Sequence, residues 1–246
     1  MLKKSIFEVT FNEKIAKDIY KMILKGDTSA IDTPGQFINI ALDGFYLRRP
    51  ISVCDYSDND VTIIYKAVGR GTDYMATMRG GEKLDVLTGL GNGFTTELSG
   101  DRPLLVGGGV GIPPMYRLAK DLKSQGKKPM VVLGFNSKEE AFYIDEFIAL
   151  GADVFISTAD GSIGIKGFVT DIIKEPYMEY TYFYACGPIP MLKALSDVTT
   201  TSGQLSFEER MGCGFGACMG CSCKTKYMDK RICKDGPVLE KEEIIW

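Results

Sequence analysis

Four cysteines near the C-terminus have the spacing of an iron–sulfur site. Cys213, Cys218 and Cys221 are separated by four and by two residues, and Cys233 follows twelve positions after Cys221. This C-x4-C-x2-C…C arrangement is typical of plant-type [2Fe–2S] clusters. A loop that aims three thiolates at one small core needs tight, partly left-handed turns, which glycine permits. The glycines of this loop are Gly212, Gly214, Gly216 and Gly220. The segment therefore predicts a protein that moves electrons one at a time.

The same cysteines could serve other chemistry. A structural zinc site could use four thiolates, but such sites usually show two C-x2-C pairs or histidine ligands, and the chain has no histidine. The odd count of seven cysteines disfavours a disulfide framework. Cys223 could compete for the fourth ligand position. Because adjacent side chains of an extended segment point to opposite faces, we expect Cys233 to be the ligand and Cys223 to be a non-ligand.

Composition argues against several classes of protein. The 246 residues carry a formal charge of −3, whereas a nucleic-acid binder shows a basic face. No apolar run approaches the roughly eighteen residues that span a bilayer. The first five residues lead directly into an alternating pattern and show no signal-peptide core. We therefore expect a soluble, cytoplasmic protein.

The first hundred residues predict an antiparallel β-barrel or sandwich. Short segments rich in β-branched and aromatic residues alternate with clusters of Gly, Pro, Asp or Asn, which is the pattern of strands and turns. The expected strands cover residues 6–11, 15–24, 36–42, 49–54, 61–68 and 83–87, with a short helix over 72–78.

After Asp101 the pattern changes to alternating strands and helices. Strands are expected over 104–106, 130–135, 154–158 and 182–186, and helices over 115–124, 139–150, 168–173 and 190–198. This alternation indicates a doubly wound α/β domain, with a parallel sheet covered on both faces. From about Gly203 the regular pattern stops. We therefore predict a multidomain α/β plus β chain, with a β-barrel over 1–98, a nucleotide-binding α/β domain over 99–203 and a small cluster domain over 204–246.

A glycine-rich turn joins the first strand of the α/β region to its first helix. Such a turn lets a pyrophosphate approach the backbone, and the helix N-terminus favours its negative charge. The glycines are Gly107, Gly108, Gly109 and Gly111. Their order departs from the six-residue dinucleotide fingerprint, so a tight turn without a ligand stays open as an alternative. Cys186, Gly187 and Pro188 follow the last α/β strand and can line the same crevice, although a lone cysteine is more often a small buried residue.

Two segments of the barrel region suit a flavin dinucleotide. Arg49 offers a fork of donors to a phosphate, and Ser52 can reach a flavin ring edge. Further along, glycines at 69 and 71 lead into a helix that we expect Thr72 to cap, which forms another anion-binding corner. Arginines are usually solvated surface residues, but two phosphate-friendly features ahead of a dinucleotide-type domain favour FAD.

Five motifs together resemble the ferredoxin reductase superfamily in order and spacing. They are Arg49-Pro50-Ile51-Ser52, Val68-Gly69-x-Gly71-Thr72, Gly91-Asn92-Gly93-Phe94, Gly107-Gly108-Gly109-Val110-Gly111 and Cys186-Gly187-Pro188. The cysteine loop, with the segment from Arg231 to Val238, is similar to one branch of that superfamily: the electron-transfer subunits of dihydroorotate dehydrogenase B. The resemblance covers nearly the whole chain.

This resemblance implies a role for each matching residue. The implied FAD contacts are Arg49 at the pyrophosphate, Ser52 near the reactive nitrogen, Pro50 and Ile51 between them in sequence, Lys66, Ala67 and Val68 along the isoalloxazine, and Gly71 and Thr72 at the phosphate. The implied NAD(H) contacts are Gly107, Gly108, Gly109 and Gly111, with Cys186, Gly187 and Pro188 toward the nicotinamide. The implied ligands of the [2Fe–2S] cluster are Cys213, Cys218, Cys221 and Cys233.

The resemblance also implies a function. NADH would deliver a hydride to FAD, and the cluster would pass the electrons singly to the FMN of a partner dihydroorotate dehydrogenase subunit. Such an assembly would be a heterotetramer of pyrimidine biosynthesis, in which this chain is an NAD-dependent oxidoreductase subunit without catalytic residues for orotate. Glu139 and Glu140 follow the second α/β strand and would repel a 2′-phosphate, which favours NADH, although a solvated helix start explains them as well.

Two other functions stay open at this point. The same scaffold could be the small flavin and iron–sulfur subunit of a bifurcating transhydrogenase or of a sulfhydrogenase, since the partner rather than this chain separates these enzymes. A zinc-stabilised binding module that has lost its flavin is an alternative of a different class. Metal analysis distinguishes it, because such a module would hold zinc without iron or acid-labile sulfide.

Overall fold

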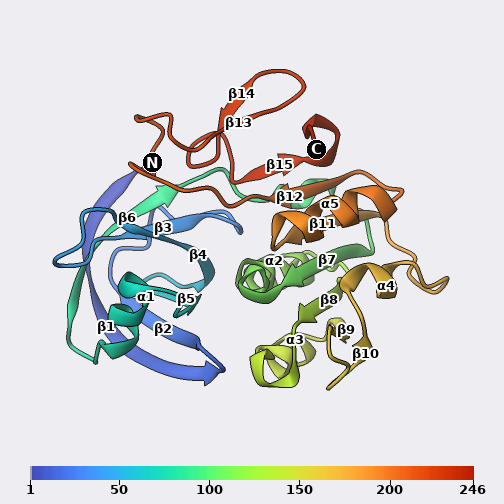
Figure 1. The fold of residues 1–246 in the computed structure, drawn as a ribbon, viewed down its shortest axis with the longest axis horizontal. Coiled ribbons are helices and arrows are strands. Elements are labelled where there is room, and N and C mark those ends of the chain that lie inside the picture. The colour runs from blue at the N-terminus through green and yellow to red at the C-terminus, as the bar shows by residue number, and fades with distance from the viewer. Residues whose placement is uncertain (1) are drawn as a thin grey trace.

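Two sheets of different kinds lie beside each other in the computed structural model, which describes residues 2–246 (Figure 1). The first is a closed antiparallel barrel with the strand order β1-β2-β5-β4-β3-β6. Its strands are β1 (Lys3–Ala16), β2 (Ile19–Lys25), β3 (Phe37–Ile40), β4 (Arg49–Tyr56), β5 (Asp60–Lys66) and β6 (Lys83–Leu90), with helix α1 (Arg70–Thr77) between the last two. A barrel is therefore confirmed rather than a sandwich.

Alternation along each strand builds the barrel interior. In β1, Phe7 and Val9 are buried while Glu8 and Thr10, which alternate with them, are exposed, because successive side chains of a strand point to opposite faces. Residues from all six strands and from α1 join them in one hydrophobic cluster. Closing the sheet leaves the barrel no unpaired edge strand.

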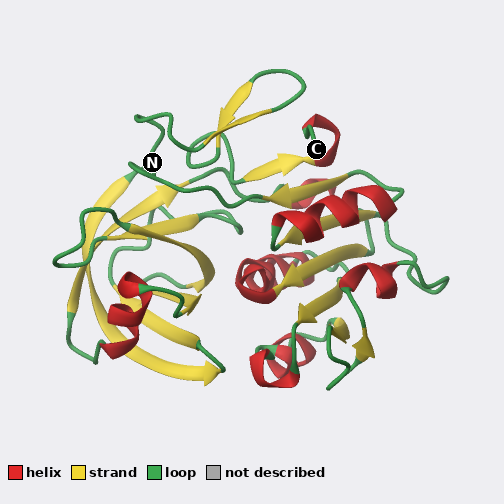
Figure 2. Cartoon of the chain, viewed as in Figure 1, coloured by secondary structure: helices red, strands yellow, loops and turns green. Residues whose placement is uncertain are grey.

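The second sheet is mostly parallel and has the order β10-β9-β8-β7-β11-β12-β15. Its strands are β7 (Pro103–Gly108), β8 (Met130–Phe135), β9 (Asp153–Thr158), β10 (Ile165–Lys166), β11 (Tyr182–Cys186), β12 (Gly203–Ser206) and β15 (Val238–Glu240). Its helices are α2 (Ile112–Ser124), α3 (Ile144–Ala149), α4 (Val169–Ile173) and α5 (Ile189–Val198). Helices α2 and α3 pack on one face, and α4 and α5 on the other (Figure 2), which confirms the doubly wound prediction.

The predicted helix over residues 139–150 is wrong in one respect, because it is interrupted. Residues Lys138–Glu140 form a short 3₁₀ turn, η3, and α3 begins only at Ile144. Between them Tyr143 takes a left-handed backbone conformation, with φ of 63°. Its buried ring packs edge-on against Tyr116 of α2, with 5.1 Å between ring centroids. This tertiary contact outweighs the local helical pattern.

The sequence pattern predicted that regular structure stops at about Gly203, and this prediction is wrong. Strand β12 begins there and pairs in parallel with β11, while β15 pairs antiparallel with β12. Between these two strands lie the cysteine loop and a hairpin of β13 (Ser222–Lys224) and β14 (Asp229–Arg231). The C-terminal region therefore extends the sheet of the α/β region. Short 3₁₀ turns complete the fold: η1 (Thr96–Leu98), η2 (Gly109–Gly111) and η4 (Lys241–Glu243).

Within residues 2–246, helices are too short and too polar to cross a membrane.

Candidate redox site

A cavity of about 280 Å³ opens where the barrel meets the second sheet. Its barrel wall contains many of the residues that the sequence assigned to FAD. The ones that line it are Pro50, Ile51 and Ser52 of β4, Lys66 at the end of β5, and Val68 and Thr72 beyond it. Six of the nine assigned side chains are thus brought together by the pairing of β4 with β5.

The other three assigned residues, Arg49, Ala67 and Gly71, adjoin this cavity without lining it. The guanidinium of Arg49 lies against Gly71, where an added Cβ would sit only 2.1 Å from Nε. Glycine is therefore required at residue 71 for this approach. The arginine is held next to the N-terminus of α1, where backbone N–H groups favour an anion.

Thr72 does not cap helix α1, contrary to our expectation. The helix begins at Arg70 after Gly69, so Thr72 lies inside its first turn. Its hydroxyl accepts a hydrogen bond from the N–H of Val68 at 3.0 Å and donates to the carbonyl of Gly69 at 3.1 Å. Thr72 therefore fixes the turn before the helix.

The opposite wall of the cavity was missed by sequence reasoning. It consists of one residue of the glycine turn, the end of β12 with the segment after it, and one residue after the cysteine loop: Val110, Ser206, Phe207, Glu208, Glu209, Met211 and Pro237. Pairing of β12 with β11 and of β15 with β12 brings these segments to the barrel. No local pattern could have indicated them, because the pairing joins residues far apart in the sequence.

A second cavity, of about 430 Å³, lies at the carboxyl ends of β7, β8, β9 and β11, which is where open α/β sheets bind ligands. Among the residues predicted to bind the dinucleotide, Gly108, Gly109 and Pro188 line it. The buried hydroxyl of Ser157 lines it too and finds no hydrogen-bond partner within residues 2–246. A bound polar group would satisfy this orphaned hydroxyl.

The remaining predicted residues of this region make close backbone contacts instead of lining the cavity. A Cβ on Gly111 would lie 2.2 Å from the carbonyl oxygen of Cys186, and one on Gly187 would lie 2.4 Å from Cε of Met191. A Cβ on Gly107 would likewise meet Ile112 at 2.7 Å. Cys186 is buried, and burial raises the pKa of its thiol to about 12. It therefore stays a neutral thiol near neutral pH.

The two cavities adjoin each other. Gly109 lines the second cavity and the next residue, Val110, lines the first. An ion pair crosses the same boundary, because Lys66 of the first cavity lies 3.4 Å from Glu140 of the second. Glu140 also accepts a hydrogen bond from Asn136 at 2.9 Å. A flavin and a dinucleotide in these cavities would be neighbours.

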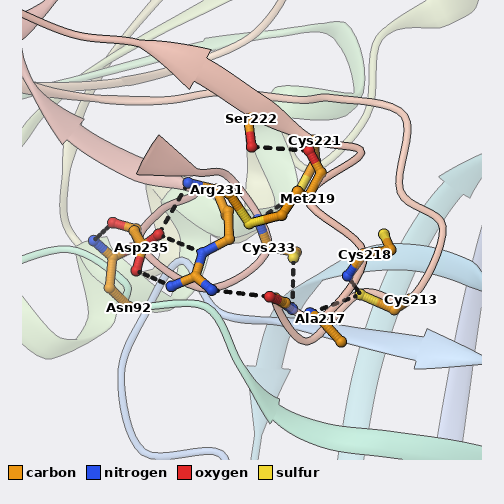
Figure 3. A network of polar contacts seen from close by, with 11 residues as sticks. Asn92, Cys213, Ala217, Cys218, Met219, Cys221, Ser222, Arg231, Cys233 and Asp235 are labelled. Atoms are coloured by element: carbon orange, nitrogen blue, oxygen red, sulfur yellow. Dashed lines mark hydrogen bonds and ion pairs between the residues drawn. The ribbon is translucent and has the colours of Figure 1, made fainter. Parts of the chain in front are cut away.

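The four predicted ligands lie together in the C-terminal region, with their sulfurs in two pairs (Figure 3). A backbone hydrogen bond joins the members of each pair, because the N–H of Cys218 donates to Cys213 Sγ and the N–H of Cys233 donates to Cys221 Sγ, each at 3.4 Å. Among residues 2–246, no three potential ligands converge on one metal ion. A binuclear core binds two thiolates on each iron, so the paired arrangement fits a [2Fe–2S] cluster rather than a single zinc ion.

Backbone N–H groups point at these sulfurs. Cys213 Sγ accepts from Ala217 at 3.2 Å and from Cys218 at 3.4 Å, and Cys233 Sγ accepts from Gly216 at 3.1 Å. Desolvation raises the pKa of the Cys213 thiol, but hydrogen bonds from Cys218, Phe215 and Ala217 outweigh it and lower this pKa to about 6. The loop therefore stabilises a thiolate at Cys213, whereas desolvation and the neighbouring Cys221 raise the pKa of the Cys233 thiol to about 12.

Two glycines and one strand boundary decide how the loop runs. Gly214 and Gly216 have φ of +79° and +88°, and a Cβ on Gly214 would lie 2.3 Å from Nδ2 of Asn39. Cys221 precedes β13, whereas Cys223 lies inside this strand and packs against the hydrophobic core. Side chains two positions apart on a strand point to the same face, so alternation does not distinguish Cys221 from Cys223. The start of β13 between them does.

Comparisons with known proteins agree with this arrangement. A model of the iron–sulfur cluster binding domain of dihydroorotate dehydrogenase B matches residues 208–245, and a model of the oxidoreductase NAD-binding domain matches residues 105–197. The FAD/NAD-binding domain of nitric oxide dioxygenase from Vibrio cholerae shares the fold, with a TM-score of 0.66 at 21% identity over 78% of this chain and 91% of that domain. Fold and site together define a ferredoxin-reductase-type oxidoreductase that carries an iron–sulfur domain.

Full-length relatives narrow this class to one family. An electron transfer subunit of dihydroorotate dehydrogenase B (NAD(+)) from Fusobacterium nucleatum is 49% identical, over 92% of this chain and 93% of the relative. The subunit of the same name from Bacillus pumilus is 46% identical, over 99% and 98%. The chain belongs to the family of dihydroorotate dehydrogenase B electron transfer subunits. A structure described for flavin-based electron bifurcation by an NADH-dependent reduced ferredoxin-NADP oxidoreductase is also similar, with a TM-score of 0.88 and 31% identity over 98% of this chain and 90% of that one.

Proposed function

We propose that this chain carries electrons between NAD(H) and the FMN of a partner dihydroorotate dehydrogenase subunit in pyrimidine biosynthesis. FAD would occupy the first cavity, NAD(H) the second, and a [2Fe–2S] cluster the four cysteines. When bound, FAD supplies exchange between hydride and single electrons, and the cluster supplies one-electron transfer.

The observation that carries this proposal is that all three regions of the chain meet at the first cavity. Ser52 comes from the barrel, Val110 from the glycine turn of the α/β region, and Pro237 from the segment four residues after Cys233. Each of the three predicted cofactor regions thus supplies part of the wall of the first cavity. Such contact is what short-range electron transfer between the three groups requires.

Individual residues have proposed roles that follow from their positions. Arg49 and the N-terminus of α1 would hold the FAD pyrophosphate, since they adjoin the cavity at Gly71. Ser52 would hydrogen-bond the edge of the flavin. Gly108, Gly109 and Pro188 would contact the dinucleotide, and Cys186 would pack behind it as a neutral thiol.

The assembly and its location are part of the proposal. The chain would join an FMN-containing catalytic subunit in a heterotetramer, and the partner would hold the residues that act on orotate. The proposed division of labour keeps the barrel at 1–98, the NAD domain at 99–203 and the cluster domain at 204–246. We place the assembly in the cytoplasm, where a reducing environment keeps thiols free to ligate iron; the seven cysteines here are unpaired.

A reconstitution experiment tests this function. The loaded protein is mixed with an FMN-containing dihydroorotate-oxidising subunit, and NADH formation from dihydroorotate and NAD⁺ is followed by absorbance. We expect a stable complex and NADH formation that needs both chains. A partner that binds but gives no NADH would contradict the proposal.

One observation favours a second candidate function. The similarity to the structure described for electron bifurcation extends over 98% of this chain, so this chain could serve as the small subunit of such an enzyme. Copurification from native cells distinguishes the two, because a second iron–sulfur flavoprotein would replace the dihydroorotate-oxidising subunit as the partner.

A further inference from the structure

A network of hydrogen bonds holds the cysteine loop against the end of the β13–β14 hairpin (Figure 3). Arg231, the last residue of β14, donates from Nε and Nη2 to the two carboxylate oxygens of Asp235, at 2.9 and 3.2 Å. Its Nη1 donates to the carbonyl oxygen of Gly216 at 2.9 Å. A bidentate carboxylate fixes the orientation of a guanidinium, so the remaining arm is aimed at the loop.

A hydrogen bond to the Gly216 carbonyl can affect the hydrogen bonds that the loop donates to the cysteine sulfurs. This carbonyl shares one planar peptide unit with the N–H of Ala217, and this N–H donates to Cys213 Sγ at 3.2 Å. The N–H of Gly216 itself donates to Cys233 Sγ at 3.1 Å. The two peptide units on either side of the Gly216 Cα therefore each donate to a sulfur, one from each pair. Because hydrogen bonds in series polarise one another, the charge of Arg231 strengthens the hydrogen bond to Cys213.

The counter-ion in this network is anchored to the barrel. Asn92, just after β6, donates from Nδ2 to the carbonyls of Val238 and Asp235, at 2.7 and 3.4 Å. Its Oδ1 accepts from the N–H of Val238 at 3.1 Å. Between these two residues lies Pro237, which lines the first cavity. The ion pair is thus held in place by the wall of the proposed flavin site.

We propose that Arg231 is a positioning residue for the cluster: through Gly216, and balanced by Asp235, it makes the reduction potential of the cluster less negative. The inference rests on the proposed function, since it requires a [2Fe–2S] cluster on the four cysteines. Reduction adds negative charge to the core, and both N–H···S hydrogen bonds and a nearby cation stabilise that charge. Arg231 supplies the cation and orients one of the donors.

The test measures the midpoint potential of the cluster in the cofactor-loaded protein, by redox titration followed with EPR spectroscopy. Arg231→Gln removes the charge and the fork, so its potential is expected to be more negative. Arg231→Lys keeps the charge, so its potential is expected to lie much closer to that of the wild type. Asp235→Asn leaves the Arg231 charge uncompensated and shifts the potential the opposite way. Lys224→Gln removes an exposed charge from β13 and, as the matched control, leaves the potential unchanged.

Three results would each overturn the inference. The potential of Arg231→Gln could be unchanged, the Gln and Lys variants could shift equally, or Arg231→Gln and Asp235→Asn could shift in the same direction. If Arg231→Gln does not retain iron, a potential of Arg231→Lys close to that of the wild type, together with a less negative potential of Asp235→Asn, supports the inference, and any other result overturns it. A reduced-cluster EPR signal in the wild-type protein keeps the cluster that the proposed function requires even where this inference fails. Its absence from wild-type protein would instead defeat the proposed function.

Discussion

The dinucleotide cavity and the cysteine loop are built in different ways. The cavity lies at the ends of buried parallel strands, and much of its wall is glycine backbone and apolar side chain. The loop has little regular structure, and its shape depends on sulfur atoms, N–H donors and two glycines with positive φ. Function is therefore spread over many residues in the cavity and concentrated on four side chains in the loop. Single substitutions should expose this difference.

The largest effect is expected in the loop. Cys218→Ser replaces one of four thiolates, and we expect reduction of the cluster by NADH to fall by about a hundredfold or more. Flavin reduction by NADH should stay largely intact, since Cys218 is exposed and does not line the first cavity. Rapid-mixing absorbance measures both steps. Cys223→Ser is the control and should change neither step; loss of flavin reduction in Cys218→Ser would show that the loop also organises the flavin site.

A backbone contact should produce the largest effect in the α/β region. In Gly111→Ala the new Cβ would lie 2.2 Å from the carbonyl oxygen of Cys186, so the turn must shift, at a cost of about 1–3 kcal/mol in unfolding free energy. We expect the KM for NADH to rise about tenfold, as a shift of about 1.4 kcal/mol in binding would produce. Urea unfolding and steady-state kinetics measure these changes.

Gly126→Ala is the matched control for the glycine turn. Gly126 has a positive φ of +78°, unlike Gly111 with φ of −81°, and no atom lies within 4 Å of an added Cβ. It should cost about 1–2 kcal/mol of backbone strain and leave the KM for NADH unchanged. Equal KM values in the two variants would remove the binding role of the turn.

An effect at least as large as that at Gly111 is expected at the proposed pyrophosphate site. Arg49→Ala removes a hydrogen bond to a charged group, which contributes about 1.5–3 kcal/mol. FAD should therefore dissociate roughly ten- to a hundredfold more readily. Flavin content after gel filtration measures this, with the exposed Arg79→Ala as the control. Equal flavin retention in the two variants would remove the assignment of Arg49.

The smallest effect concerns the choice between NADH and NADPH. Glu140 lines the dinucleotide cavity, whereas Glu139 is exposed. In Glu140→Gln one negative charge is lost, and we expect the KM for NADPH to fall by about threefold while stability changes by less than about 1 kcal/mol, because the ion pair with Lys66 is partly exposed. Glu139→Gln should leave the KM unchanged. If Glu139→Gln changed the KM for NADPH more than Glu140→Gln does, the 2′-phosphate would bind elsewhere than beside Glu140.

Sequence patterns predicted the elements whose information is local. Strands β8 and β11 have the predicted bounds, because each is a short buried run between turn residues. The cysteine spacing pointed to the loop correctly, since ligand spacing is a property of one continuous segment. The flavin wall from Ser206 to Met211 was not predictable in this way. It depends on pairing between β12 and β15, whose residues are more than thirty positions apart.

Long-range packing also explains the other differences. The helical pattern over 139–150 is locally sound, but the buried ring of Tyr143 turns the chain between η3 and α3. Thr72 has the residue type of a cap, yet the helix begins at Arg70, and the Thr72 hydroxyl bonds Val68 and Gly69 in the turn before it. Local rules therefore found the groups that we propose to bind cofactors, and tertiary contacts decided how those groups are joined.

The central claim is that flavin, dinucleotide and cluster sites in one chain form a single electron path. An anaerobic titration of the cofactor-loaded protein with NADH, followed by absorbance and EPR spectroscopy, tests it most directly. The account predicts that NADH bleaches the flavin absorbance and produces the EPR signal of a reduced [2Fe–2S] cluster in the same sample. Flavin bleaching without that signal, or a preparation that holds zinc in place of iron and sulfide, would contradict it.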